Sequence, residues 1–179
     1  SLLAAAERPG RVSRVVLFDP VIWGGLTSVV FRAPLLRRLS DRIPLVRTAL
    51  RRRAVFDSRE QALEAYRGRG AFKGWSDISL IDYLSDGLIE RAEGGFALAC
   101  APQWEASNYV SQGHDPWRAM RTFGGSVHIL KAETGSISQV PDAPRGLRNV
   151  AVETVPGGHH LFPMVRADVV RDALFDAAI

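Results

Sequence analysis

The residues best suited to chemistry in this sequence are two adjacent histidines, His159 and His160, in the stretch GGHHLFPM at 157–164. Two carboxylates, Asp19 and Glu133, directly follow apolar, β-favouring runs elsewhere in the chain. A carboxylate that accepts a hydrogen bond from one ring nitrogen of a histidine fixes the tautomer, so the other nitrogen can take a proton from a nucleophile or water. An acid and a histidine of this kind indicate general-base catalysis.

Other chemical motifs are missing from the 179 residues. No G-x-S-x-G turn is present to carry a serine nucleophile, and Ser1 has Leu3 where such a turn needs glycine. The spacing of His, Cys, Asp and Glu matches no zinc site, and no glycine-rich nucleotide motif occurs. We therefore expect no metal and no organic cofactor.

Three β-favouring apolar runs must position these side chains, at 12–19, 126–132 and 150–155, and Pro156 is expected to end the third. Both faces of the first run are apolar, and helical patterns lie between the runs and at 167–179, which is typical of an α/β fold with a parallel sheet. The carboxyl ends of parallel strands share one edge of a sheet, where ligands bind. The two carboxylates and the histidine pair are therefore expected at that edge.

Residues 23–120 separate the first run from the second and carry helical spacing interrupted by glycines and prolines. This pattern predicts a set of short helices inserted between core strands. Aromatic side chains of the insertion are candidates to line an apolar substrate pocket, with plain core packing as the alternative. They are Trp75, Tyr83, Trp104 and Tyr109.

Composition excludes several classes of protein. Hydrophobic residues make up 46% of the chain and charged residues 23%, as in an ordinary globular domain, and the net charge is +4. Eight arginines fall within one short segment, which we expect to be a solvated helix face. No aromatic residue interleaves with them, so binding of nucleic acid is not expected. They are Arg32, Arg37, Arg38, Arg42, Arg47, Arg51, Arg52 and Arg53.

Cys100 is the single cysteine, so no intrachain disulfide forms; we expect a buried thiol and a reducing, cytoplasmic location. No apolar stretch approaches the roughly 20 residues that span a bilayer, so no membrane partner is expected. The chain opens on SLLAAA, which reads as the middle of a helix. We therefore expect a fragment of a longer protein.

The order of these features resembles the α/β-hydrolase fold family: a strand ending in Asp-Pro, a helical insertion, two strands, the GGHHLFPM stretch and a last helix. The resemblance implies a partial α/β-hydrolase fold, with three parallel core strands and flanking helices at 1–22 and 121–179, and a mostly helical cap at 23–120. The family's histidine stands just ahead of a short apolar-Pro-Met stretch. This position implies His160 as the catalytic base, with His159 lining the pocket.

The resemblance offers two candidates for the acid. In the commonest arrangement the acid follows the next-to-last strand as Gly-Glu-x-Asp, but Gly135 stands where that aspartate would fall, after Glu133. Some branches, including haloalkane dehalogenase-like ones, carry the acid one strand earlier, where Asp19 stands. Asp19 is therefore favoured, and Glu133 is the alternative.

The implied function is hydrolysis of an ester or related bond in a small apolar substrate. Because the family's nucleophile and oxyanion hole would lie before Ser1, we expect this chain alone to be inactive. An aspartate nucleophile would instead make an epoxide hydrolase or haloalkane dehalogenase-like enzyme. Outside enzymes, the alternative is a hydrolase-derived binding module whose arginine-rich segment is its contact surface. The oligomeric state is left open.

Overall fold

The structure is a computed structural model, and it describes residues 1–24, 44–111 and 113–178. The chain divides into two compact units. The sheet unit joins Ser1–Ser28 to His114–Ile179, and the insertion unit is Val29–Gly113. The division into a hydrolase core and a cap, with boundaries near 22 and 121, remains a prediction.

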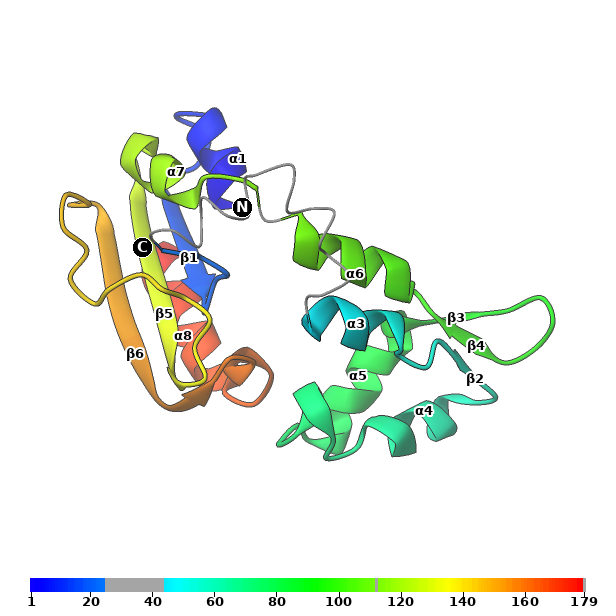
Figure 1. The fold of residues 1–179 in the computed structure, drawn as a ribbon. Coiled ribbons are helices and arrows are strands. Elements are labelled where there is room, and N and C mark those ends of the chain that lie inside the picture. The colour runs from blue at the N-terminus through cyan, green and yellow to red at the C-terminus, as the bar shows by residue number, and fades with distance from the viewer. Residues whose placement is uncertain (25–43, 112, 179) are drawn as a thin grey trace. The chain divides into compact units, whose positions relative to one another are not determined.

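Three parallel strands form the centre of the sheet unit: β1 (Arg14–Phe18), β5 (Ser126–Thr134) and β6 (Val150–His159). The strand β5 lies between the other two, as the yellow strand between blue β1 and orange β6 in Figure 1. Their starts are aligned, because Arg14 pairs with Ser126 and the next residue of β5 pairs with Val150. The predicted α/β class with three parallel core strands is confirmed.

Helices cover both faces of this sheet. One face packs against α1 (Leu2–Glu7) and α7 (Pro116–Thr122), and the other against η3 (Phe162–Met164) and α8 (Ala167–Ala178). Burial on two faces explains why β1 reads as a continuous apolar run rather than an alternating one. The core side chains of the first face include Leu2, Ala5, Val15, Met120, Val127, Ile129 and Val150.

The strand β6 is longer than the sequence predicts, since it continues past Pro156 to His159. Val127 donates its N–H to the carbonyl of Asn149, and hydrogen-bonding direction alternates along a strand. Pro156 therefore directs its nitrogen away from β5, where no ladder bond is lost. A register shift follows, after which His159 pairs with Thr134. This extension brings the histidines to the edge of the sheet.

The insertion unit combines short helices with a small antiparallel sheet. Its helices are α3 (Pro44–Leu50), α4 (Arg59–Tyr66), η2 (Gly70–Phe72), α5 (Asp77–Gly87) and α6 (Pro102–Val110). Its strands, in sheet order, are β2 (Val55–Phe56), β4 (Phe96–Leu98) and β3 (Leu88–Glu90). The helical spacing of the sequence predicts the helices, but the strands were not predicted, because two or three residues are too short to show an alternating pattern.

Two expectations about burial in this unit are wrong. Cys100 is exposed, because it lies in the link between β4 and α6 rather than inside an element. Arg47, Arg51 and Arg53 are exposed, but only Arg47 lies on a helix, because α3 ends at Leu50. Arg52 is half-buried among aromatic side chains. The other four arginines of the segment, Arg32, Arg37, Arg38 and Arg42, lie outside the described residues.

Candidate active site

Asp19 stands at the carboxyl end of β1 and is 1% exposed. Its backbone N–H donates to the carbonyl of Leu130 at 2.7 Å, so the residue still belongs to the sheet ladder. It has a φ of 40°, in the left-handed region that few residues other than glycine adopt. Such a conformation persists only where the surroundings hold it, and it is frequent at functional sites.

The Asp19 carboxylate accepts four hydrogen bonds. Oδ1 accepts from the backbone N–H of Ala132 at 3.0 Å and from the hydroxyl of Ser136 at 2.5 Å. Oδ2 accepts from the backbone N–H of Ile137 at 3.2 Å and contacts His160 Nδ1 at 2.8 Å. A carboxylate has about four lone-pair positions, so this set fills them.

These contacts decide the ionisation state of Asp19. Burial alone would raise the pKa of the carboxyl group, but the hydrogen bonds from Ser136, Ala132, His160 and Ile137 favour the anion, and the pKa lies below its ordinary value. An ionised carboxylate can only accept, so the proton between it and His160 belongs to Nδ1. In the neutral ring, Nε2 is then the basic nitrogen.

His160 lies between β6 and η3, and buried neighbours hold that segment in place. Phe162 is fully buried and packs edge-on against Phe18, with ring centroids 6.2 Å apart. The preceding end of β6 depends on Gly158, where a Cβ would come within 2.9 Å of the carbonyl of Val155. The His160 side chain itself is 41% exposed. Its ring is thus anchored at one nitrogen and accessible to a reactant.

Glu133, the alternative acid, has a different partner. Its Oε2 accepts from the backbone N–H of Gly157 at 2.8 Å, so it supports the segment that leads to His160. Next to it, Thr134 donates its hydroxyl to the carbonyl of Gly158 at 3.2 Å. The structure thus brings His160 together with Asp19, and ties Glu133 to the backbone three residues ahead of the histidine.

His159 also makes a local contact. Its Nδ1 accepts from the backbone N–H of Leu161 at 3.2 Å, and its side chain is half-buried. Because a backbone N–H only donates, Nδ1 of His159 carries no proton. The two adjacent rings therefore hold opposite tautomers. A role for His159 in lining a substrate pocket remains a prediction.

The four aromatic residues proposed for the pocket are not equivalent. Trp75 and Tyr83 pack edge-to-face in the core of the insertion unit, with ring centroids 5.7 Å apart. Tyr109 donates its hydroxyl to Glu105 at 3.1 Å, while Trp104 is 70% exposed. Trp75, Tyr83 and Tyr109 thus have packing or hydrogen-bonding partners within their unit. Contact of any of the four with a substrate remains a prediction.

Sequence reasoning missed the donors that hold Asp19. Ser136 belongs to none of the motifs identified in the sequence, and the backbone N–H groups of Ala132 and Ile137 have no sequence signature. The one available signal is the loop that follows the second predicted strand, where Gly135 and Ser136 interrupt the apolar pattern. That loop supplies two of the four contacts to Asp19, from Ser136 and Ile137, and a third comes from Ala132 within β5.

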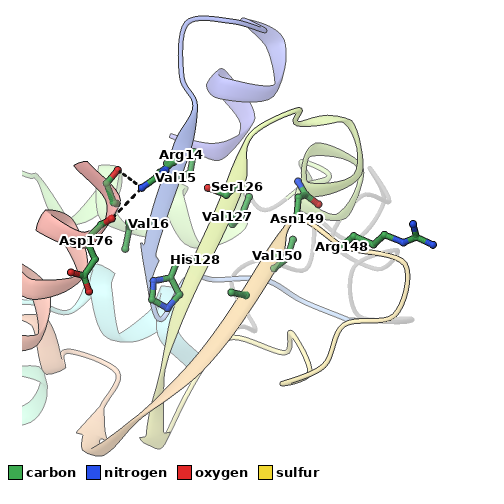
Figure 2. Close-up of a pocket in the computed structure, with 12 residues that line it drawn as sticks. Arg14, Val15, Val16, Ser126, Val127, His128, Arg148, Asn149, Val150 and Asp176 are labelled. Carbon is green, nitrogen blue, oxygen red and sulfur yellow. Dashed lines mark hydrogen bonds between the residues drawn. The ribbon is translucent and has the colours of Figure 1, made fainter. Parts of the chain in front are cut away.

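A pocket of about 430 Å³ occupies the opposite end of the sheet (Figure 2). Its lining includes Arg14, Ser126 and Val150, which begin the three strands. Arg14 donates to the carbonyls of Asp176 and Ala177 at 3.1 and 3.3 Å, and so satisfies the C-terminus of α8 (dashed lines in Figure 2). Ligands of parallel sheets bind at the carboxyl ends of the strands. Asp19 and His160 lie at that end, and this pocket does not.

Within the described ranges, no three His, Cys, Asp or Glu side chains gather in a way that could hold a metal ion. Among the described helices, none combines the length and hydropathy that crossing a membrane would need.

Neither the protein-family models nor the curated protein sequences match this chain. Solved structures do. An E-2-(acetamidomethylene)succinate hydrolase superposes with a TM-score of 0.72 and 22% identity over 99% of this chain and 61% of that one. A peroxisomal alpha-beta-hydrolase from Saccharomyces cerevisiae superposes with a TM-score of 0.63 and 16% identity, over 96% of this chain and 47% of that one. An M. tuberculosis esterase superposes with a TM-score of 0.58 and 16% identity, over 97% of this chain and 58% of that one. The chain spans about half to three fifths of their lengths.

Proposed function

We propose that this chain, which has the α/β-hydrolase fold, supplies the acid and base of a hydrolase that cleaves an ester or related bond in a small apolar substrate. The observation that carries the proposal is the 2.8 Å contact between His160 Nδ1 and Asp19 Oδ2, at the carboxyl end of a parallel sheet. Structural neighbours named as hydrolases and an esterase support it at a coarse level.

In this proposal His160 acts through Nε2. That nitrogen removes a proton from the attacking hydroxyl or water while the nucleophile forms its bond to the substrate. The resulting imidazolium is stabilised by the ionised Asp19, and it then gives the proton to the leaving group. Asp19 keeps the ring oriented throughout and does not itself take up the proton. No metal or organic cofactor enters these steps.

The nucleophile and the oxyanion hole are not assigned to this chain, because its 179 residues contain no G-x-S-x-G turn. We therefore expect the chain by itself to be inactive towards esters. A second candidate function is favoured by the partner of His160. An acid at the exit of β1, rather than after β5, is the arrangement of haloalkane dehalogenase-like enzymes, so an aspartate nucleophile would fit this site.

The first experiment is to sequence the coding DNA upstream of Ser1 and to express the longest reading frame that it encodes. A serine elbow predicts hydrolysis of p-nitrophenyl esters and covalent labelling by a fluorophosphonate. An aspartate in that turn predicts turnover of epoxides or haloalkanes, with ¹⁸O from water entering the enzyme carboxylate in a single turnover. A reading frame without any elbow and without turnover would contradict the proposal.

The adjacent histidines provide a matched control for that protein. His160→Ala should lower kcat by about 10³-fold, because general-base catalysis contributes about 10²–10⁴-fold. His159→Ala removes the same side chain one residue away and should leave kcat within a few-fold of the original. Equal losses in the two variants would remove the basis for assigning the base to His160.

A further inference from the structure

The hydroxyl of Ser136 lies between the acid and the loop that follows β5. Gly135 precedes it with a φ of 65°, which lets the chain turn back towards the sheet after β5 ends. Ser136 Oγ then lies 2.5 Å from Asp19 Oδ1. Among the described residues, Ser136 and His160 are the two whose side chains form hydrogen bonds with this carboxylate.

The direction of this hydrogen bond follows from the other neighbours of Ser136. The backbone N–H of Ser138 donates to Ser136 Oγ at 3.2 Å and so occupies one of its lone pairs. The hydroxyl proton could be directed to the carbonyl of Ser138 at 3.5 Å or to the ionised Asp19 at 2.5 Å. The carboxylate is both closer and charged, and hydrogen bonds to charged acceptors are the stronger ones. Ser136 therefore donates to Asp19.

We propose that Ser136 is a positioning residue of the candidate active site, which fixes the Asp19 carboxylate and keeps it ionised so that it can orient His160. This inference rests on the proposed function for its catalytic meaning. The backbone N–H groups of Ala132 and Ile137 hold one oxygen each, and Ser136 adds the second donor to Oδ1. The side chain acts on the base only through the acid.

The test is NMR titration of the chain labelled with ¹³C and ¹⁵N. The Asp19 carboxyl carbon reports the pKa of the acid, and the His160 ring nitrogens report which one carries the proton. In Ser136→Ala the pKa of Asp19 should shift upwards, because a donor that favours the anion is lost. The fraction of His160 rings that carry their proton on Nδ1 should also fall. Ser136→Thr retains the hydroxyl and should restore both signals.

A matched control lies two residues along the loop. Ser138 is also buried, but its Oγ has no hydrogen-bond partner among the described residues. Ser138→Ala should therefore leave the Asp19 titration and the His160 spectrum unchanged. If Ser136→Ala behaves like Ser138→Ala, Ser136 is not a positioning residue. These signals require no turnover, so failure of the hydrolase proposal would leave this result intact.

If Ser136→Ala does not fold, the hydroxyl proton of Ser136 in the unaltered chain provides the test. A hydroxyl proton held by a buried carboxylate should exchange slowly with water and show a cross-peak between Ser136 and Asp19, which disappears when Asp19 is protonated by acid. A Ser136 hydroxyl proton that exchanges rapidly at neutral pH, with the chain folded, would overturn the inference.

Discussion

Each unit of this protein contains a buried or half-buried charge with several hydrogen-bond partners, Asp19 in the sheet unit and Arg52 in the insertion unit, and the two differ in what their partners can do. In the sheet unit, the buried carboxylate of Asp19 accepts hydrogen bonds from β5, from the loop that follows β5 and from His160. In the insertion unit, the half-buried guanidinium of Arg52 collects acceptors from three helices.

The Arg52 contacts are all within the insertion unit. Nη1 donates to Glu105 at 2.9 Å, Nε to the hydroxyl of Tyr66 at 3.3 Å, and Nη2 lies 3.5 Å from the hydroxyl of Tyr83. The guanidinium also lies over the ring of Tyr66, 5.1 Å from its centroid. Burial would lower the pKa of Arg52, but Tyr66 and Glu105 outweigh it and the pKa is raised.

The comparison teaches that burying a charge is not enough to make a reactive site. Each nitrogen of Arg52 has a partner that also belongs to the unit's internal packing, so the contacts join α4, α5 and α6. Asp19 instead holds a ring whose side chain is 41% exposed and which carries a second nitrogen. We therefore expect Arg52 to serve stability and Asp19 to serve both stability and chemistry.

The largest effect on stability is expected for Asp19→Ala. Removing the carboxylate leaves the donors of Ala132, Ile137 and Ser136 without their acceptor in a buried position, which should lower the free energy of unfolding by about 3 kcal/mol. Urea denaturation would measure this. Asp142→Ala is the control, because its ion pair with Lys131 is 77% exposed on the aspartate side and should contribute less than about 1 kcal/mol. Similar losses in both variants would contradict the comparison.

Arg52→Ala should come next, with a loss of about 2 kcal/mol in the free energy of unfolding. The side chains of Arg52 and Glu105 are each 24% exposed, so the cost lies between those of exposed and buried pairs. Its neighbour Arg51 is exposed, and Arg51→Ala should change stability by less than about 0.5 kcal/mol. An Arg52→Ala variant as stable as Arg51→Ala would show that the buried guanidinium does not hold the insertion unit together.

The third prediction concerns acid. The pKa of Asp19 is lower in the folded chain than its ordinary value near ~3.9, so its contribution to stability is present above that value and lost as pH falls through the folded pKa. Asp19→Asn should therefore flatten the decline of unfolding free energy at acid pH, by at most about 1.4 kcal/mol per pH unit. Urea midpoints between about pH 2 and 5 would test this. The exposed Asp168 also has a lowered pKa, but it is present in both the unaltered chain and Asp19→Asn, so the difference between their curves reports Asp19. Parallel curves would mean that Asp19 is not held as an anion.

The smallest effect is expected for Glu133→Gln. Glutamine keeps an oxygen that can accept from the backbone N–H of Gly157, so stability should change by less than about 1 kcal/mol. In a protein with turnover, kcat should likewise stay within a few-fold, whereas Asp19→Asn should lower it strongly. The reverse order of kcat losses would make Glu133 the acid and would undo the distinction between the two carboxylates.

Much of the architecture could be predicted from the sequence, because it depends on local preferences. The run around Val15 is β-favouring and apolar on both faces, which is typical of a covered parallel strand, and the runs around Ile129 and Val152 are β-favouring. The order of Asp19, the insertion and the GGHHLFPM stretch was enough to indicate the fold family. Strands such as β2, with two residues, were beyond this reasoning because they have no period to read.

By itself, the sequence determined the class of fold and the candidates for the site: two adjacent histidines, and Asp19 or Glu133 as the acid. Only the tertiary structure decided how they meet. Asp19 and His160 are 141 positions apart, and their contact depends on the order β1-β5-β6 and on the bulged end of β6. Two of the four donors that keep Asp19 ionised are backbone N–H groups, which leave no mark in the sequence because nearly every residue type carries one. Their arrangement is therefore a property of the folded end of β5 and the loop after it, and not of any residue pattern.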